Sequence, residues 1–502
     1  MHMLNTNPAA HMGWNTPRTR TRGKIKGHFL IGMILIILVT GSIAYALVSM
    51  QINLKNNQST MNSQTIPAIA TTQQVQKDLE TLDIQASDFL AAGDLTGQQG
   101  CTLAGLKTTT MVTHQVCDTQ EIDAETILLN QDLFAATNNR ADADQQTLLE
   151  RISIGIEGYL TDIHQMRVDY ALATQKANLH DPHIQQAYQD YYNASQVLYN
   201  QISLPDPAIS LHSNQIPFNS TGQSTCIIAR ESEPLPPDQW MQLGLLQTLD
   251  CLNNIDQTNL TETYTNQSSS FTGGTATLLY ILFVSVLVFY LFHMVRWTHR
   301  LVNLGLLAAT LLGISLGYFN WNTLTEIPGN AYQQAIEHDY ATISSTDQLQ
   351  NTVLDARASE SRWLLATLFK DKASAITWNG AWQIDATQIA MLQGQVQETN
   401  NLPAEAQYLA SVNNVWSNYT AIDAQIHTTQ SFATAEHLKT EQASTTLDGL
   451  ENILEQIIQD EQANYNLAQN AIQKPDPLTD LLLFPLTALL AVLGIASNLK
   501  HF

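Results

Sequence analysis

The sequence predicts an all-α integral membrane protein with four transmembrane helices and two extracytoplasmic antiparallel helical bundles. Three observations predict it: four long runs without charge, an uneven distribution of acids and bases, and helical periodicity in the two polar segments between the runs. Of 502 residues, 13% are charged, against about 25% in a typical soluble domain.

The distribution of charge excludes one class of function and suggests another. The net charge is −23, from 45 acids and 22 bases, and residues 1–50, 275–325 and 481–502 contain no Asp or Glu. Such an acidic chain lacks the basic face that nucleic acid requires, so no nucleic-acid partner is expected. Acid-free runs flanked by Lys and Arg are typical of membrane spans.

Four spans are expected, because each uncharged run is close to the ~20 residues that cross a hydrocarbon core. The bases place both termini and the short central turn on the cytoplasmic side, which predicts a multi-pass plasma-membrane protein. For the first run a signal peptide is the alternative, but its length and the lack of a clear cleavage site favour an anchor. The predicted parts are a cytoplasmic basic tail (1–28), spans at 29–50, 275–295, 301–319 and 480–498, a cytoplasmic turn (296–300), extracytoplasmic domains at 51–274 and 320–479, and a cytoplasmic end (499–502).

Both extracytoplasmic segments have the pattern of amphipathic helices. Apolar residues recur at three- and four-residue steps in 75–90 and 148–173, and at near-heptad spacing in 433–472. No alternating β pattern of useful length appears. Pro67 and Pro328 are expected to break the helices beside the spans.

Four cysteines, all in the first extracytoplasmic segment, predict two disulfides: Cys101, Cys117, Cys226 and Cys251. An even number on the oxidising side of a membrane favours disulfides over free thiols. Among three possible connectivities, the local pairs Cys101–Cys117 and Cys226–Cys251 are favoured. No CxxC pair or Cys/His cluster indicates zinc, so no metal site is expected.

Catalytic motifs are absent from the sequence. It has no Walker loop, GxSxG, HExxH or GxGxxG, so the chain is not expected to be an enzyme or to need a cofactor. Carboxylate pairs are plentiful, and solvated helix faces explain nearly all of them. Transport is disfavoured, because no charged residue lies at membrane depth in the predicted spans. The predicted cytoplasmic parts are too small to form a core, so any signal must be read by another protein.

The candidate ligand-binding residues are Arg357, Arg362 and Trp363, which lie on about two turns of a predicted helix. An Arg inside a bundle can anchor a carboxylate through two hydrogen bonds. The alternative, which we favour, is an intrahelical ion pair between Arg357 and Glu360.

Small residues recur every four positions along the third predicted span, at Gly305, Ala309, Gly313 and Gly317. Such a stripe lets another helix approach closely. The partner helix can belong to a second copy, which would make the protein a homo-oligomer, or to the same chain. Packing within the chain is favoured.

Three short stretches, at 86–93, 159–178 and 355–365, carry a family resemblance. With the arrangement of span, bundle and span, the chain resembles the four-helix-bundle sensor domains of bacterial chemoreceptors and sensor kinases. It is more closely similar to tandem-bundle tetraspan proteins of actinobacteria. That resemblance implies a protein that passes amino-acid availability from a solute-binding lipoprotein to a cytoplasmic Ser/Thr kinase.

The expected function is that of a non-catalytic membrane sensor or receptor component. It would pass a small-molecule or partner-protein signal to a separate cytoplasmic protein. The expected partners are membrane lipid, a solute-binding protein outside, and a kinase or other effector inside. The alternative is a structural or scaffolding subunit of a cell-envelope or transport complex, which the expected helix breaks favour.

Overall fold

The computed structural model describes residues 18–91, 98–103, 106–138, 143–174, 176, 178–199, 244–271, 274–298, 304–321, 330–331, 333–399, 403–473, 486–493 and 496, some of them without their side chains. The chain divides into two compact units. The first comprises Met1–Lys55, Gln267–Asn330 and Ala471–Phe502, and the second comprises Asn56–Asn266 and Ala331–Asn470. The segments predicted as separate extracytoplasmic domains therefore contribute to the same unit.

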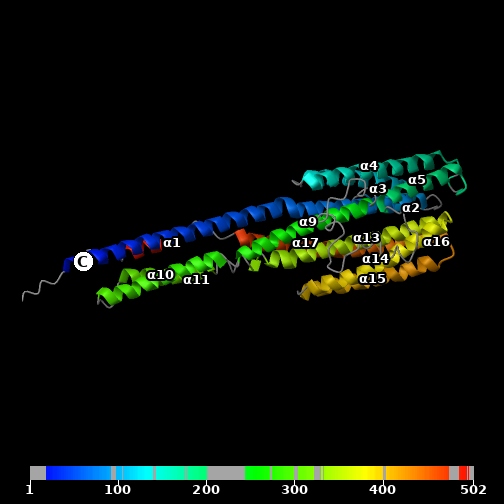
Figure 1. Ribbon diagram of the computed structural model, residues 1–502. Coiled ribbons are helices and arrows are strands. Elements are labelled where there is room, and N and C mark those ends of the chain that lie inside the picture. Colours follow the sequence, from blue (N-terminus) through cyan, green and yellow to red (C-terminus); the bar gives the residue numbers. More distant parts are fainter. Residues whose placement is uncertain are drawn as a thin grey trace, which may run out of the picture. The chain divides into compact units, whose positions relative to one another are not determined.

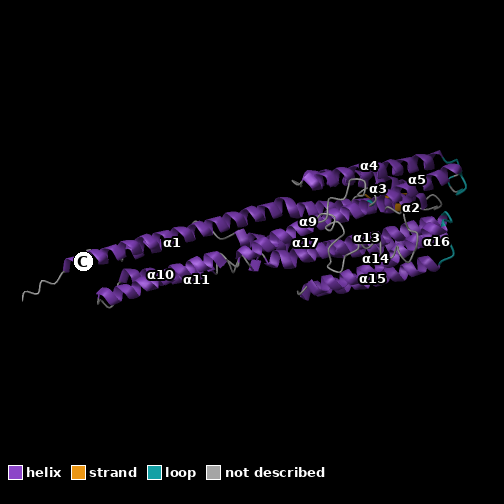
Figure 2. Ribbon diagram, viewed as in Figure 1, coloured by secondary structure: helices purple, strands orange, loops and turns teal. Residues whose placement is uncertain are grey.

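The described residues are almost entirely helical (Figures 1 and 2). The larger, second unit contains α2 (Ile66–Ala91), α3 (His114–Asn138), α4 (Ala143–Leu172), α5 (Pro182–Tyr199), most of α9 (Leu245–Phe271), α13 (Ala341–Leu368), α14 (Lys372–Thr399), α15 (Pro403–Thr428), α16 (Phe432–His437) and most of α17 (Ser444–Gln473). Three π-helical turns also belong to it: η1 (Met61–Thr65), η5 (Gln334–Tyr340) and η6 (Leu438–Ala443). The first unit contains α10 (Gly274–Thr298), α11 (Leu304–Trp321) and most of α1 (Arg18–Thr60).

One β-hairpin departs from the expected all-helical pattern. Strand β1 (Gln98–Leu103) pairs antiparallel with β2 (Leu106–Thr113), with a register shift between Gly100 and Thr102. The β2 sequence LKTTTMVT is rich in Thr and Val, which favour extended backbone. Only two residues, one of them glycine, separate the strands in the sequence, a spacing typical of a tight hairpin.

The predicted transmembrane helices are contradicted. Among the helices that the structure describes, none combines the length and the apolarity needed to cross a membrane. The all-α part of the predicted fold class fits the structure. The integral-membrane part and the multi-pass plasma-membrane localisation were wrong.

The predicted spans were inferred from long uncharged, apolar runs with basic flanks. Helix α1 contains the first of these runs and continues into polar sequence up to Thr60. Helix α11 has 18 residues, or about 27 Å at ~1.5 Å per residue, which is short of a ~30 Å core. Most of the fourth predicted span lies outside the described residues.

The first unit has its own small core. Ile36 of α1, Phe283 and Leu287 of α10, and Leu306 and Ala309 of α11 are buried together. Other large apolar side chains of this unit are exposed, including Leu30, Phe289 and Leu304. The helices pack closely: a Cβ added at Gly32 would lie 2.4 Å from the ring of Tyr290.

The small-residue stripe lies along α11. Ala309 is fully buried, and a Cβ added at Gly313 would lie 3.4 Å from Leu287 and 3.5 Å from Phe283. The hydroxyl of Tyr280 donates to the Gly313 carbonyl at 2.6 Å. These contacts lie within one chain. The surroundings of Gly305 and Gly317 are outside the described residues, so a role of the stripe in oligomerisation stays a prediction.

The second unit is built on the predicted helical periodicity. Leu447, Leu450, Leu454 and Ile457 of α17 recur at near-heptad spacing and are at most 1% exposed. They pack with Tyr419 of α15 and with buried residues of α13, α14 and η6. Burial of this stripe, rather than intrinsic helix propensity, stabilises the helix.

The two sequence halves of this unit share a core. Helix α13 packs against both α14 and α2. Leu365 and Leu368 of α13 belong to the cluster formed mainly by α2, α3, α4, α5 and α9. Ile84 of α2 packs with Leu354 and Ala358 of α13 in a further buried cluster.

The expected helix break at Pro67 was wrong. Residues 18–91 are helical throughout, with the π turn η1 between α1 and α2. Both residues that cap this turn, Thr60 and Ile66, keep right-handed helical backbone angles. A π turn adds one residue to a helical turn, which gives a proline an alternative to ending the helix.

Truncating the α17 stripe should destabilise the unit. Leu454→Ala removes a fully buried side chain, and we expect it to lower the free energy of unfolding by about 2–5 kcal/mol. Leu467→Ala on the same helix removes a side chain that is 68% exposed, and it should change stability by about 0.5 kcal/mol or less. Chemical denaturation followed by circular dichroism measures both. Equal effects would show that the Leu454 side is not the packed face.

Candidate functional site

The sequence-predicted ligand residues do not converge on one site. Arg357 and Arg362 are five positions apart on α13, which corresponds to about 140° around a helix. Arg362 faces α2, where its partner is Asp83, and Arg357 faces α17, where its partner is Ser444. A spacing of five residues on a helix places the two arginines on different faces.

Arg362 forms a buried ion pair. Its Nε donates to Oδ2 of Asp83 at 2.7 Å, and the two side chains are 1% and 0% exposed. The hydroxyls of Tyr191 and Tyr159 also donate to Asp83, at 3.3 and 3.4 Å. The guanidinium carbon lies 3.8 Å from the ring centre of Tyr199, in the geometry of a cation–π contact.

These contacts satisfy the carboxylate of Asp83 and hold the guanidinium on two sides. The second aromatic side is Trp378 of α14, whose ring centre lies 4.6 Å from the guanidinium carbon. A side chain held in this way joins α2, α13 and α14. Nη1 of Arg362 has no hydrogen-bond partner in the protein, and a ligand-binding role for Arg362 stays a prediction.

Arg357 binds to helix α17 rather than to its own helix. Its Nη2 donates to the Ser444 hydroxyl at 2.8 Å, and its Nη1 lies 3.7 Å from Asp448 and 3.8 Å from Glu451. The favoured intrahelical pair with Glu360 is not among the ion pairs of the described residues. The carboxylate of Glu360 instead accepts a 2.6 Å hydrogen bond from the Tyr419 hydroxyl.

Trp363 contacts helix α15. Its indole stacks on the imidazole of His427, with ring centres 3.7 Å apart and planes at 26°. His427 in turn lies 3.3 Å from Asp423, four residues earlier on α15. This stack ties α13 to α15.

Buried carboxylic acids outnumber buried cations in this unit. Around Arg362, burial raises the pKa of Glu80 well above its usual range and also raises those of Asp355 and Asp385. Burial raises the pKa of Glu360 to about 7, although the Tyr419 hydrogen bond opposes it. The expectation that acids lie on solvated faces was wrong for these residues, because helices that are packed on several sides have no solvated face there.

A second acidic group lies where α2 and η6 meet. Lys439 contacts Asp88 in a partly buried ion pair. Burial raises the pKa of nearby Glu436 to about 7, against the lowering effect of Lys439. Burial also raises the pKa of Asp118 well above its usual range.

Cys117 is disulfide-bonded, and its partner lies outside the described residues, so the predicted pairings stay predictions. The structure shows no disulfide between two residues that it describes with their side chains. Cys117 is fully buried, and the described part of the chain has no free thiol. The side chains of Cys101, Cys226 and Cys251 lie outside the described residues. Among the described residues, no group of three His, Cys, Asp or Glu could hold a metal ion.

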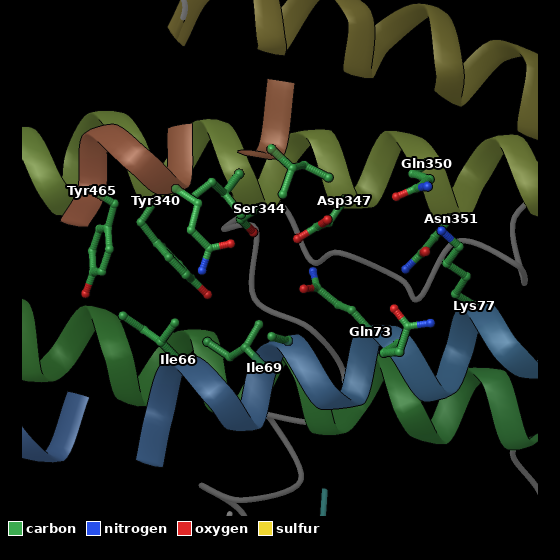
Figure 3. A pocket seen from close by; sticks show the side chains of 15 residues that line it. Ile66, Ile69, Gln73, Lys77, Tyr340, Ser344, Asp347, Gln350, Asn351 and Tyr465 are labelled. Atoms are coloured by element: carbon green, nitrogen blue, oxygen red, sulfur yellow. The ribbon is translucent and has the colours of Figure 1, made fainter. Parts of the chain in front are cut away.

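The candidate site is a pocket of about 190 Å³ between α2, η5 with the first turns of α13, and α17 (Figure 3). Helix α2 supplies Ile66, Ile69, Gln73 and Lys77 to its wall. The opposite wall carries Tyr340 of η5 and Ser344, Asp347 and Asn351 of α13, with Tyr465 from α17. Residues nearly 400 positions apart in the sequence thus line one cavity.

Two buried polar groups of this wall lack a hydrogen-bond partner in the protein. They are Nε2 of Gln73 and the hydroxyl of Tyr340, on side chains that are 6% and 8% exposed. A buried polar atom without a partner costs about 1–3 kcal/mol, and other such atoms occur elsewhere in the described residues. Figure 3 shows both side chains directed into the space between the helices.

The pocket also holds two opposite charges. Lys77 and Asp347 are half-buried. Loss of water raises the pKa of Asp347 to about 7, and the attraction of Lys77 offsets this only in part. At neutral pH the carboxyl group can therefore gain or lose a proton as its surroundings change.

Local irregularities of the helices flank the pocket. The π turn η1 ends at Thr65, next to Ile66, and η5 ends at Tyr340 itself. π turns occur frequently at functional sites. One sequence signal of the site was present: Gln73 and Lys77 continue the helical spacing of Ile66, Ile69 and Ala70, so polar residues follow apolar ones along one side of the helix.

Breaking the buried ion pair should strongly destabilise the unit. Asp83→Asn and Arg362→Met each leave one charged or polar partner buried, and we expect each to cost about 3–5 kcal/mol. The double variant should recover much of that loss, because neither charge is then buried alone. A double-mutant cycle in urea measures the coupling.

An exposed pair provides the matched control. Arg167 lies 2.7 Å from Asp123, the same distance as in the buried pair, but the two side chains are 25% and 61% exposed. Arg167→Met should cost about 1 kcal/mol or less, because water screens the pair. A comparable loss in both pairs would show that burial is not what makes Arg362 important.

The buried acids should make the protein less stable as pH rises. A carboxyl group with a folded-state pKa of about 7 and an ordinary value of 4.5, such as Glu360, stabilises the folded state fully below pH 4.5. That contribution is lost as pH rises through 7. Glu360→Gln should reduce the fall in stability between pH 5 and 7 by up to about 1.4 kcal/mol per pH unit.

Urea denaturation at pH 5, 6, 7 and 8 measures this slope. Glu455→Gln is the control, because Glu455 is exposed on α17. It should leave the slope unchanged. A slope that is the same in Glu360→Gln and in the unmodified protein would show that Glu360 is ionised throughout this range.

Comparison with known proteins adds nothing to what the geometry shows. None of the family models, curated proteins or solved structures compared with this chain matches it. The resemblance to chemoreceptor-like and actinobacterial sensor proteins, and the partners that it implies, therefore stay predictions. The pocket and the buried charges are the features that bear on function.

Proposed function

We propose that this protein is a non-catalytic sensor or receptor component whose second unit binds a small polar molecule in the pocket between α2, η5–α13 and α17. The bound state would be read by a separate protein. The observation that carries the proposal is the pair of buried, unpartnered polar groups, Gln73 Nε2 and Tyr340 OH, in the wall of one cavity.

The composition of the wall supports a small-molecule ligand rather than a packing defect. A defect of the core would be lined by apolar groups, as engineered cavities are. This wall combines aliphatic Ile66 and Ile69 with Gln73, Lys77 and Asp347. Ligand sites likewise combine apolar surface with a few polar groups that fix orientation.

The position of the pocket supports a role in signalling. Its walls come from the two sequence halves, which meet along α2 and α13. A ligand that contacts both walls favours whichever arrangement of these helices it fits best, and so shifts their equilibrium.

Substituting the two unpartnered groups should raise stability and weaken ligand binding. Gln73→Met and Tyr340→Phe keep the shape of each side chain and remove the polar atom. We expect each to raise the stability of the ligand-free protein, by up to about 1–3 kcal/mol. Each should also weaken binding of any ligand that contacts these groups.

Thermal-shift measurements of the full chain against a library of small polar metabolites test both effects. A ligand that raises the midpoint for the unmodified protein should do so less for Gln73→Met. Gln459→Leu on the exposed face of α17 is the control and should respond as the unmodified protein does. Ligands that act equally on all variants, or no ligand at all, would favour the scaffolding alternative.

A further inference from the structure

Resting on the function proposed above, we infer that the ligand of this pocket is a small zwitterion with an apolar end. Its protonated amine would be held by Asp347, and its carboxylate by Lys77 and Gln73. The inference extends the proposal from a small polar molecule to one chemical class.

The charges that line the pocket favour a zwitterion. Asp347 on α13 and Lys77 on α2 line the same cavity and attract each other. No ion pair joins them among the described residues, so each remains able to bind an opposite charge on a ligand. A ligand that carries both charges can pair with both groups, whereas one that carries a single charge can pair with only one of them.

The unpartnered donor of Gln73 favours a carboxylate on the ligand. Nε2 of Gln73 can donate hydrogen bonds but cannot accept one. It lies on the same helix as Lys77, four residues before it, and therefore on the same side. A carboxylate oxygen is an acceptor that an amide N–H and an ammonium group can share, and hydrogen bonds to charged groups are the stronger ones.

The polarity of the pocket changes from one end to the other. Figure 3 shows Ile66, Ile69, Tyr340 and Tyr465 at one end, and Lys77, Asn351 and Gln350 at the other. Gln73 and Asp347 lie between them. Both charges of the ligand therefore belong at one end of the molecule, and its apolar part belongs beside the isoleucines.

The protonation of Asp347 links binding to pH. The charged and titratable groups that face it are Lys77 of α2, Tyr340 of η5 and Tyr465 of α17, and burial raises the pKa of both tyrosines. Of these groups, the Asp347 carboxyl is the one whose pKa, about 7, lies in the neutral range. An ammonium group beside it favours the ionised form. Affinity should therefore fall by up to roughly tenfold per pH unit below 7.

Matched ligands test the class by isothermal titration of the full chain at pH 8. Leucine and β-leucine carry both charges at different spacings. 3-Methylbutylamine lacks the carboxylate of leucine, and 4-methylpentanoate lacks its amine. We expect at least one zwitterion to bind, and both single-charge counterparts to bind at least tenfold more weakly.

Substitutions test the assigned contacts. Asp347→Asn should weaken zwitterion binding more than tenfold and remove its pH dependence, while 4-methylpentanoate binding changes little. Lys77→Met should weaken zwitterion binding and leave 3-methylbutylamine unaffected. Asp460→Asn and Lys372→Met, at exposed positions of α17 and α14, are the controls and should bind as the unmodified protein does.

The outcomes separate this inference from the function on which it rests. Equal binding of a zwitterion and one of its single-charge counterparts would overturn the zwitterion assignment and leave a small-molecule receptor. The same holds if neither zwitterion binds while another metabolite depends on Gln73 and Tyr340. If no small molecule binds in a way that depends on these residues, both the inference and the proposed function fail.

Discussion

The second unit depends on the buried ion pair between Asp83 of α2 and Arg362 of α13, two residues 279 positions apart in the sequence. Removing two charges from water is costly, and their attraction offsets that cost only with good geometry and further hydrogen bonds. Here the hydroxyls of Tyr159 and Tyr191 supply those hydrogen bonds to Asp83. An isolated half of the chain would bury one of these charges without its partner, so the pair favours joint folding of both halves.

The same joint burial explains the excess of buried acids and the polar pocket. Helices that pack on two or three sides carry carboxylates such as Glu80 and Glu360 into the interior, where burial raises their pKa. Most of these groups are surrounded by protein. Asp347 differs, because a cavity adjoins it and an opposite charge, Lys77, lines the same cavity. That difference is what makes this carboxyl group available to a ligand.

Several local sequence signals do not decide the structure of this chain. Uncharged runs predicted membrane spans, yet none of the described helices has the length and apolarity of a span. Pro67 predicted a break, yet the π turn η1 lets the helix continue into α2. Arg357 and Glu360 were expected to pair because they are three residues apart, but each forms a hydrogen bond with a residue of another helix instead. For Arg357 and Glu360, contacts with other helices outweighed the local signal.

By itself, the sequence determined the helical class and the buried faces. The heptad-like leucines of α17 and the stripe of α2 are buried as their periodicity predicts, because an amphipathic helix has one face that packing can bury. Only the tertiary structure decided which helices meet. Gln73, Lys77, Tyr340 and Asp347 are unremarkable polar residues in the sequence. They become a candidate site because α2 and α13 pack against each other, and no local pattern specifies the partner of an apolar face.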